Sequence, residues 1–225
     1  MSIATADGGK LSIWRLLFIA VCIGIGAAAL ILGLDAIAEY IAVAPNGVAW
    51  PLELVAMLYL IPLLAAIGLV ISLVLVLMPS ARREGLTAFV TGIVFLAVMF
   101  LVAPQIGQIR TNGFRKAAQN AKPLIAAIGA YEREHGAPPA DLAGLVPEYL
   151  AAIPATGLGA YPAYDYEAKP QTAENNFGNS WLLAINASTG AVNWDLFLYL
   201  PKQNYPEHGY GGSLERVDDW AYVHE

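Results

Sequence analysis

The sequence predicts a membrane protein in which three transmembrane helices precede a small α+β domain. Hydrophobic residues make up 57% of the chain and charged residues only 13%, which is more apolar than an average soluble protein. The apolar residues concentrate in three long runs in the first half, and strand-like segments follow in the second. We therefore divide the chain into a cytoplasmic N-terminus (1–15), a three-helix transmembrane anchor (16–104) and an extracytoplasmic α+β domain (105–225).

The three runs cover residues 16–34, 52–78 and 85–103. Each is near or above the roughly 20 residues that a helix needs to cross a bilayer core of ~30 Å. Buried helices of a soluble protein are the alternative, but three nearly charge-free runs in succession favour membrane spans. The first run has a basic start like that of a signal peptide, yet its apolar part is too long and no A-x-A cleavage pattern closes it. We expect it to be retained as a span.

Basic residues near the spans predict the orientation, because Lys and Arg are retained on the cytoplasmic side. Lys10 and Arg15 precede the first span, Arg82 and Arg83 lie between the second and third, and the segment 35–51 has no basic residue. This pattern places the N-terminus inside and the C-terminal domain outside, in the periplasm if the cell is Gram-negative. Four basic residues after the third span oppose the assignment: Arg110, Arg115, Lys116 and Lys122. Long terminal domains translocate largely regardless of their charge, so we keep it.

Within the anchor, Gly24 and Ala28 lie four positions apart and leave one face of the first span open to close helix contact. We favour contact within the chain over a dimer interface. Glu53 stands at the start of the second span, where it can reach water and favours the positive end of a helix. Cys22 is the only cysteine, which excludes an intramolecular disulfide and a cysteine zinc site.

The segment after the third span predicts a helix that leads into a compact domain. Pro104 marks the outer end of the span, and a helical pattern resumes over 115–135, with Pro123 able to kink it or to start a new helix. Gly136 is typical of a left-handed helix end, and Asp141 can cap a short helix that follows.

Strand-like segments rich in aromatic and branched residues cover 164–167, 181–187 and 194–200, separated by Gly, Asn and Pro turns. The last segment, 220–224, predicts an edge strand. We therefore expect one long helix to pack across a small antiparallel sheet.

The words "AAIGAYEREHGAPPADLAGLVPEYLAAIP" and "TGLGAYPAYDY" give residues 117–167 a family resemblance. They resemble the globular head of type IV pilin-like proteins, most closely the major pseudopilin of type II secretion. The resemblance implies a span that runs into a long helix whose far half lies on a sheet. The whole chain is also similar to uncharacterised bacterial membrane proteins with a pilin-like head, which implies no activity.

The leader region departs from that family. Pilin-like proteins have one span, a leader cut after Gly, and a Glu five residues into the mature chain. Here "RREGLTAFV" offers Gly85, but Val90 stands where that Glu is needed. We therefore expect neither cleavage before Leu86 nor filament assembly.

No motif predicts an enzyme. His135, His208 and His224 are too scattered for a spacing-defined metal site, and no catalytic or phosphate-binding fingerprint occurs in the required context. The net charge of -6 argues against a nucleic-acid partner.

Two groups of residues near the C-terminus are candidates for binding. Asp195, Asp218, Asp219 and Glu225 offer oxygen ligands of the kind that calcium prefers, and pseudopilin heads bind calcium in a C-terminal loop. Their spacing matches no recognised loop, so we expect no cofactor, with calcium as the alternative.

The second group consists of the aromatic residues Tyr205, Tyr210, Trp220 and Tyr222. Exposed aromatic residues dominate interface energetics, but they also cover small sheets. We favour the core over a partner surface.

Taken as a whole, the sequence predicts a non-enzymatic assembly, scaffold or binding subunit of an envelope complex in a bacterial cytoplasmic (inner) membrane. Its expected partners are the lipid bilayer and other envelope membrane proteins. One alternative is a processed pseudopilin-type subunit of a secretion or pilus system. The other is an accessory subunit of a membrane enzyme or transporter, which would need ionisable groups near mid-membrane.

Overall fold

The computed structural model describes residues 11–168, 172–188 and 194–224. The chain folds into two compact units. The first unit holds the described residues up to Leu34 and the segment Met57–Pro104. The second unit holds everything else that is described.

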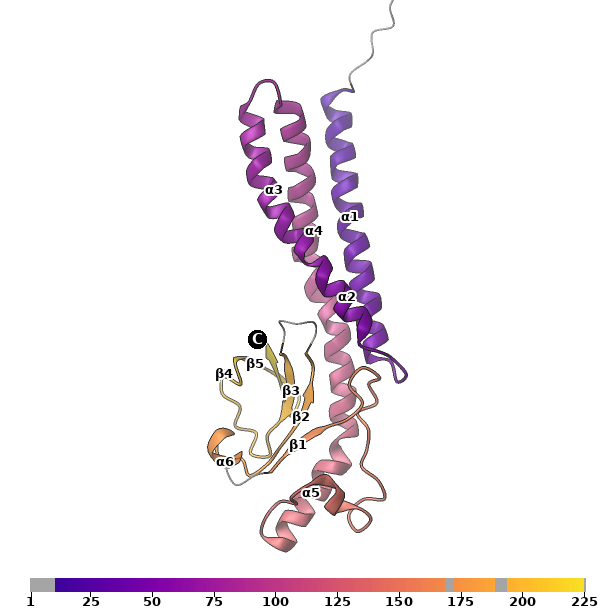
Figure 1. Cartoon of the computed structure of the whole chain (residues 1–225), viewed down its shortest axis with the longest axis vertical. Helices are drawn as coiled ribbons and strands as arrows, with labels where there is room; N and C mark the ends of the chain where they lie inside the picture. The colour runs from indigo at the N-terminus through magenta and orange to yellow at the C-terminus, as the bar shows by residue number, and fades with distance from the viewer. Residues whose placement is uncertain (1–10, 169–171, 189–193, 225) are drawn as a thin grey trace, which may run out of the picture. The chain divides into compact units, whose positions relative to one another are not determined.

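Three helices in the described residues are long and apolar enough to cross a membrane, as predicted. They are α1, the pair α2 and α3, and α4 (Figure 1). The helices of the chain are α1 (Ile13–Val43), α2 (Trp50–Leu58), α3 (Leu60–Leu77), α4 (Arg82–Asn120), α5 (Lys122–His135), the 3-10 helix η1 (Leu142–Leu145) and α6 (Thr172–Asn175).

Two helices run further than the sequence predicts. Helix α1 continues past the end of the first apolar run at Leu34 and ends at Val43. Helix α4 continues through Pro104 to Asn120, although proline removes one backbone hydrogen bond from a helix interior. Hydrophobicity marks where an apolar run ends, whereas helical structure continues wherever packing supports it.

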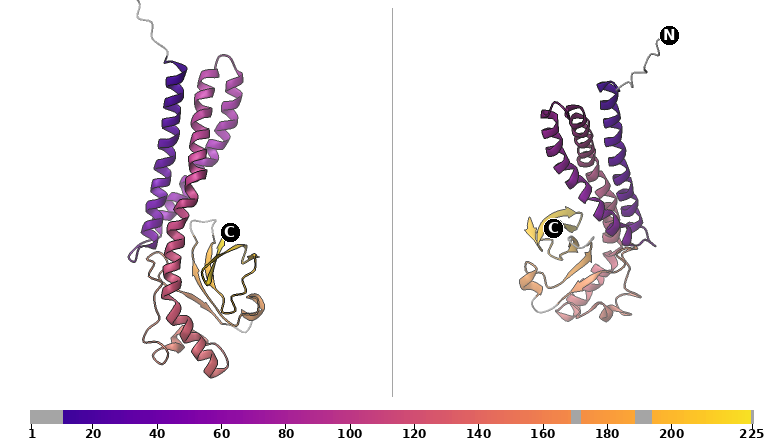
Figure 2. Two further views of the ribbon diagram at one scale, coloured as in Figure 1. Left: turned by 180° about the vertical axis from the view of Figure 1, so that it is seen from behind. Right: turned by 45° about the horizontal axis from the view of Figure 1, so that its top comes forward.

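In the first unit, small residues bring helices into close contact. A Cβ atom on Gly24 of α1 would lie 2.7 Å from the carbonyl oxygen of Thr91 on α4, and Ala28 is fully buried. A Cβ atom on Gly85 would lie 2.6 Å from the backbone nitrogen of Val76 on α3. Helices α3 and α4 accordingly lie side by side (Figure 2).

The second unit contains an antiparallel sheet of six strands in the order β1-β2-β3-β6-β5-β4. The strands are β1 (Asp165–Glu167), β2 (Leu182–Asn186), β3 (Leu196–Tyr199), β4 (His208–Gly209), β5 (Gly212–Val217) and β6 (Trp220–His224). The expectation that 220–224 forms an edge strand is wrong, because β6 pairs with both β3 and β5. Strand β5 was not predicted, because its charged residues Glu215 and Arg216 interrupt the hydrophobic pattern of a strand.

Alternate residues of the sheet face two different cores, as the twofold repeat of a strand requires. Leu183 and Phe197 face the core that also contains residues of α4 and α5. Leu182 and Leu198 face a smaller core on which Tyr205 and Tyr210 pack. Helices therefore cover one face of the sheet, and the connection from β3 to β5 covers the other.

Local signals around α5 agree with the sequence. Pro123 lies in the first turn of α5, and Gly136 ends the helix in the left-handed conformation at φ 75°. The side chain of Asp141 accepts a hydrogen bond from the backbone nitrogen of Gly144 and caps η1. The hydroxyl of Tyr164 donates to the carbonyl of Ala117 and fixes the end of α4 against the segment that leads into β1.

Candidate functional site

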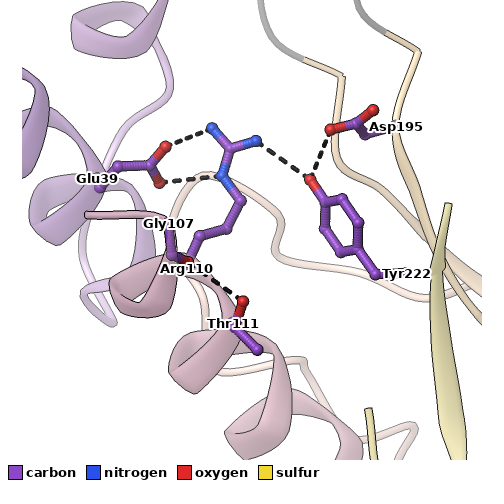
Figure 3. Close-up of polar contacts among 6 residues, drawn as sticks. All are labelled: Glu39, Gly107, Arg110, Thr111, Asp195 and Tyr222. Carbon is purple, nitrogen blue, oxygen red and sulfur yellow. Dashed lines mark hydrogen bonds and ion pairs between the residues drawn. The ribbon is translucent and has the colours of Figure 1, made fainter. Parts of the chain in front are cut away.

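A buried ionic network joins α1, α4 and the sheet inside the second unit (Figure 3). Arg110 of α4 donates from Nε to Glu39 Oε2 at 3.0 Å and from Nη2 to Glu39 Oε1 at 2.5 Å. Its Nη1 donates to the hydroxyl of Tyr222 on β6 at 3.2 Å. That hydroxyl donates in turn to Oδ2 of Asp195 at 2.7 Å. One guanidinium thus connects two carboxylates, one of them through a phenol.

The network is almost closed to solvent. Glu39 is 7% exposed and Asp195 is 6% exposed. A buried carboxylate is tolerated only when it is paired and hydrogen-bonded, and the two-pronged contact of arginine suits a carboxylate best. Burial raises the pKa of Tyr222 above its ordinary value, although the nearby Arg110 opposes that shift. The phenol therefore stays protonated and keeps donating to Asp195.

Tyr161 lies near the network and interacts electrostatically with Arg110 and Glu39. Its hydroxyl is buried and has no hydrogen-bond partner in the described part of the chain, and its ring lies 5.6 Å from that of Phe114. Burial raises its pKa, while the charge of Arg110 lowers it. The phenol thus lies within the electrostatic reach of Arg110.

Backbone contacts attach the segment between the first two spans to the C-terminal domain. The backbone nitrogen of Gly159 donates to the carbonyl of Ala44 at 2.8 Å, and that of Ala160 donates to Ala42 at 3.1 Å. Helix α4 also comes very close, because a Cβ atom on Gly113 would lie 2.6 Å from Val43. The segment Asp35–Ala56 is therefore a structural part of the domain.

The network connects helix α1, helix α4 and strand β6 through side-chain hydrogen bonds. The carboxylate of Glu39 is occupied by Arg110 through both of its oxygens, and the Arg110–Glu39 pair is formed by residues 71 positions apart in the sequence. The pair joins the C-terminal part of α1 to the C-terminal part of α4 within the second unit.

The residues proposed for calcium lie in different surroundings. Asp195 belongs to the buried network, whereas Asp218 and Asp219 line a cavity of about 380 Å³ beside Lys122 of α5. Glu225 lies outside the described residues. Within the described residues, no three metal-ligating side chains gather at one place.

The four C-terminal aromatic residues are largely packed against the sheet. Trp220 is 1% exposed and belongs to the main core, and Tyr222 belongs to the network. Tyr205 and Tyr210 pack on the smaller core. The hydroxyl of Tyr205 donates to the carbonyl of Asp219. This placement follows the core alternative more closely than the partner-surface alternative.

Glu39 and Arg110 are the main residues that the sequence reasoning missed. From the sequence, Arg110 is only one of the basic residues that follow the third span, and Glu39 is only one residue of the segment 35–51 between two spans. A signal was present, because Asp35 and Glu39 are four positions apart after the first run and therefore share a helix face. Both are buried.

Comparisons with protein-family models, with curated proteins and with solved structures find no match to this chain.

Proposed function

We propose that the protein is a non-enzymatic, membrane-anchored assembly, scaffold or binding subunit of a bacterial envelope complex. Its three apolar helices serve as the anchor. The six-stranded sheet and its covering helices form a pilin-like head on the extracytoplasmic side of the inner membrane.

The observation that carries this proposal is the buried Glu39–Arg110–Tyr222–Asp195 network. It joins the last turns of α1 and the C-terminal third of α4 to strand β6. A subunit that positions a partner benefits from a head whose own elements are held in one arrangement. The network supports a scaffold role because its charged groups are used for contacts within the chain.

The distribution of basic residues supports the orientation. Arg15 precedes the apolar part of α1, and Arg82 and Arg83 begin α4. Arg110 is one of the basic residues that follow the third span. It forms an ion pair with Glu39. Because its charge is neutralised inside the fold, Arg110 opposes the orientation less than a simple count suggests.

The test is gentle purification from the native membrane, followed by intact-mass measurement and identification of stoichiometric partners. We expect an uncleaved chain of 23.9 kDa together with a defined envelope protein. A chain that begins at Leu86 would instead support a processed pseudopilin-type subunit.

A variant pair makes the test specific to the head. Glu39→Gln breaks the network, and we expect it to lose the partner. Glu53→Gln removes a carboxylate from the first turn of α2 and serves as the control that keeps the partner. If both variants recover the partner equally, the network in the head is not needed for partner binding, and the proposal is contradicted.

A further inference from the structure

The first unit contains a large cavity between the N-terminal part of α1 and the helices α3 and α4. Its volume is about 990 Å³, which is at the upper end of the range for small-molecule sites in proteins. The cavity lies entirely within the first unit, since all of its lining residues belong to the described residues up to Leu34 or to Met57–Pro104.

Small side chains create this space. Ala65 and Gly68 of α3 and Ala88 and Gly92 of α4 line its wall. The contact between Gly24 and α4 brings the helices together further along α1, so the cavity opens on the N-terminal side of that contact. Its apolar wall is suited to a hydrocarbon chain.

One end of the cavity is polar and is lined by one basic and one acidic residue, Arg83 and Glu84. Arg83 and Ser80 line this end, and an Nη atom of Arg83 donates to the carbonyl of Leu11. Glu84 also lines the cavity. The hydroxyl of Thr87 is engaged within α4, where it donates to the carbonyl of Arg83. Arg83 is therefore the cationic group that faces the cavity.

In the described part of the chain, basic residues exceed acidic residues at this end of the unit. Arg82 precedes Arg83 and donates to the carbonyl of Val76, and Arg15 lies in the first turn of α1. Among the described residues at this end, Glu84 is the one acidic residue against these three arginines. The end therefore carries an excess of positive charge next to an apolar space.

We propose that this cavity binds one anionic phospholipid, with its phosphate at Arg83 and an acyl chain along Ala65, Gly68 and Gly92. A basic pocket between transmembrane helices on the cytoplasmic side is suited to an anionic headgroup, and arginine matches the geometry of phosphate oxygens. The inference rests on the proposed membrane insertion and orientation, but it is independent of the role of the head.

The experiment uses the full chain in nanodiscs of mixed phosphatidylglycerol and phosphatidylcholine, followed by native mass spectrometry of the released protein. We expect one phosphatidylglycerol to be retained in preference to phosphatidylcholine. Equal retention of both lipids, or a second copy of the chain in place of lipid, would overturn the proposal. Displacement of the lipid by millimolar inorganic phosphate would show that a free phosphate suffices, and would overturn a lipid site.

Two variants with matched controls locate the site. Arg83→Gln should lower the retained phosphatidylglycerol about fivefold, as expected for one basic residue at a lipid surface. Arg115→Gln removes the same charge from α4 elsewhere, where Arg115 contacts Asn112, and should leave retention unchanged. Equal loss with both variants would indicate a general charge effect and contradict the site.

The second variant changes volume without changing charge. Ala88→Phe fills part of the cavity and should displace the acyl chain, whereas Ala66→Phe places the same ring on an exposed position of α3 that does not line the cavity. Lipid retention that is unaffected by Ala88→Phe would overturn the proposal.

A preceding alkaline carbonate wash separates this inference from the proposed function. Release of the chain from the membrane would overturn both. A chain that stays in the membrane but shows no lipid preference overturns the phospholipid site alone.

Discussion

Arg110 donates to a carboxylate and to a phenol at once, and its loss would leave Glu39 buried without a counter-charge. Breaking a buried pair by removing one partner costs about 3–5 kcal/mol, because the remaining charge keeps its desolvation penalty. The neighbouring Arg115 is half-buried, and its hydrogen bond to Asn112 lies at the surface. The two arginines on one helix therefore differ in what they contribute to stability.

We expect Arg110→Met to lower the thermal midpoint of the second unit by about 10 °C. Arg115→Met on the same helix should change it by only a degree or two, since surface contacts contribute little. The measurement is unfolding in detergent followed by tryptophan fluorescence, because Trp181 and Trp220 are buried in this unit. Similar midpoints for both variants would show that the network is not stabilising.

Tyr222 makes stability depend on pH in the alkaline range. Its pKa is raised above the ordinary value of 10.0, mainly by burial, so the unfolded chain loses this proton at lower pH than the folded protein does. The stabilising contribution is complete below about pH 10 and is lost as the pH rises above that value.

The variant Tyr222→Phe should therefore be less stable than the parent at neutral pH, by about 1–3 kcal/mol, because the hydrogen bond from the Tyr222 hydroxyl to Asp195 is lost. Above about pH 10 its stability should fall less steeply with pH, because the variant lacks the Tyr222 hydroxyl whose pKa is raised in the folded protein. Thermal midpoints measured between pH 7 and pH 11 test both parts. A parallel decline for the two proteins would assign the alkaline effect to other tyrosines.

At the scale of elements, Gly113 lets α4 pass close to the end of α1. A Cβ atom at this position would lie 2.6 Å from Cγ1 and 2.7 Å from Cβ of Val43. Valine is stiff about χ1 and cannot easily move away. Gly107, on the same helix, has nothing within 4 Å of the equivalent point.

Gly113→Ala should consequently destabilise the second unit by about 1–3 kcal/mol, as overpacking does. Gly107→Ala should stabilise it slightly, by up to about 1 kcal/mol, because alanine favours helix. Chemical denaturation in detergent micelles compares the two. Stabilisation by both substitutions would mean that α1 and α4 do not approach each other as described.

Periodicity and end signals predicted most elements of the fold, because these signals are local. The apolar runs, the helix end at Gly136 and the cap at Asp141 depend on neighbouring residues only. The network and strand β5 were not predicted. Glu39 and Arg110 lie 71 positions apart, and β5 becomes recognisable only through its pairing with β6.

At the scale of the whole molecule, the second unit is discontinuous in sequence. It combines Asp35–Ala56 with the residues from Gln105 onward. A boundary drawn after the third span, as hydrophobicity suggests, separates residues that pack together. A fragment that begins at residue 105 would lack Glu39 and leave Arg110 unpaired.

The fragment 105–225 should accordingly fold less stably than the same unit in the full chain. The expected loss is of the order of 3–5 kcal/mol for the unpaired Arg110 alone. Hydrogen exchange of the sheet amides in the fragment and in the full chain measures the difference. Equal protection in both would show that Asp35–Ala56 contributes nothing to the fold.

The central claim is that the chain is anchored with its head on the extracytoplasmic side, and site-directed labelling tests it most directly. In a Cys22→Ser background, Lys202→Cys places a thiol on the exposed surface of the head, and Ser80→Cys places one in the turn between α3 and α4. We predict that a membrane-impermeant maleimide labels the Lys202→Cys variant in intact cells and labels Ser80→Cys only after permeabilisation. The reverse pattern would contradict the claim.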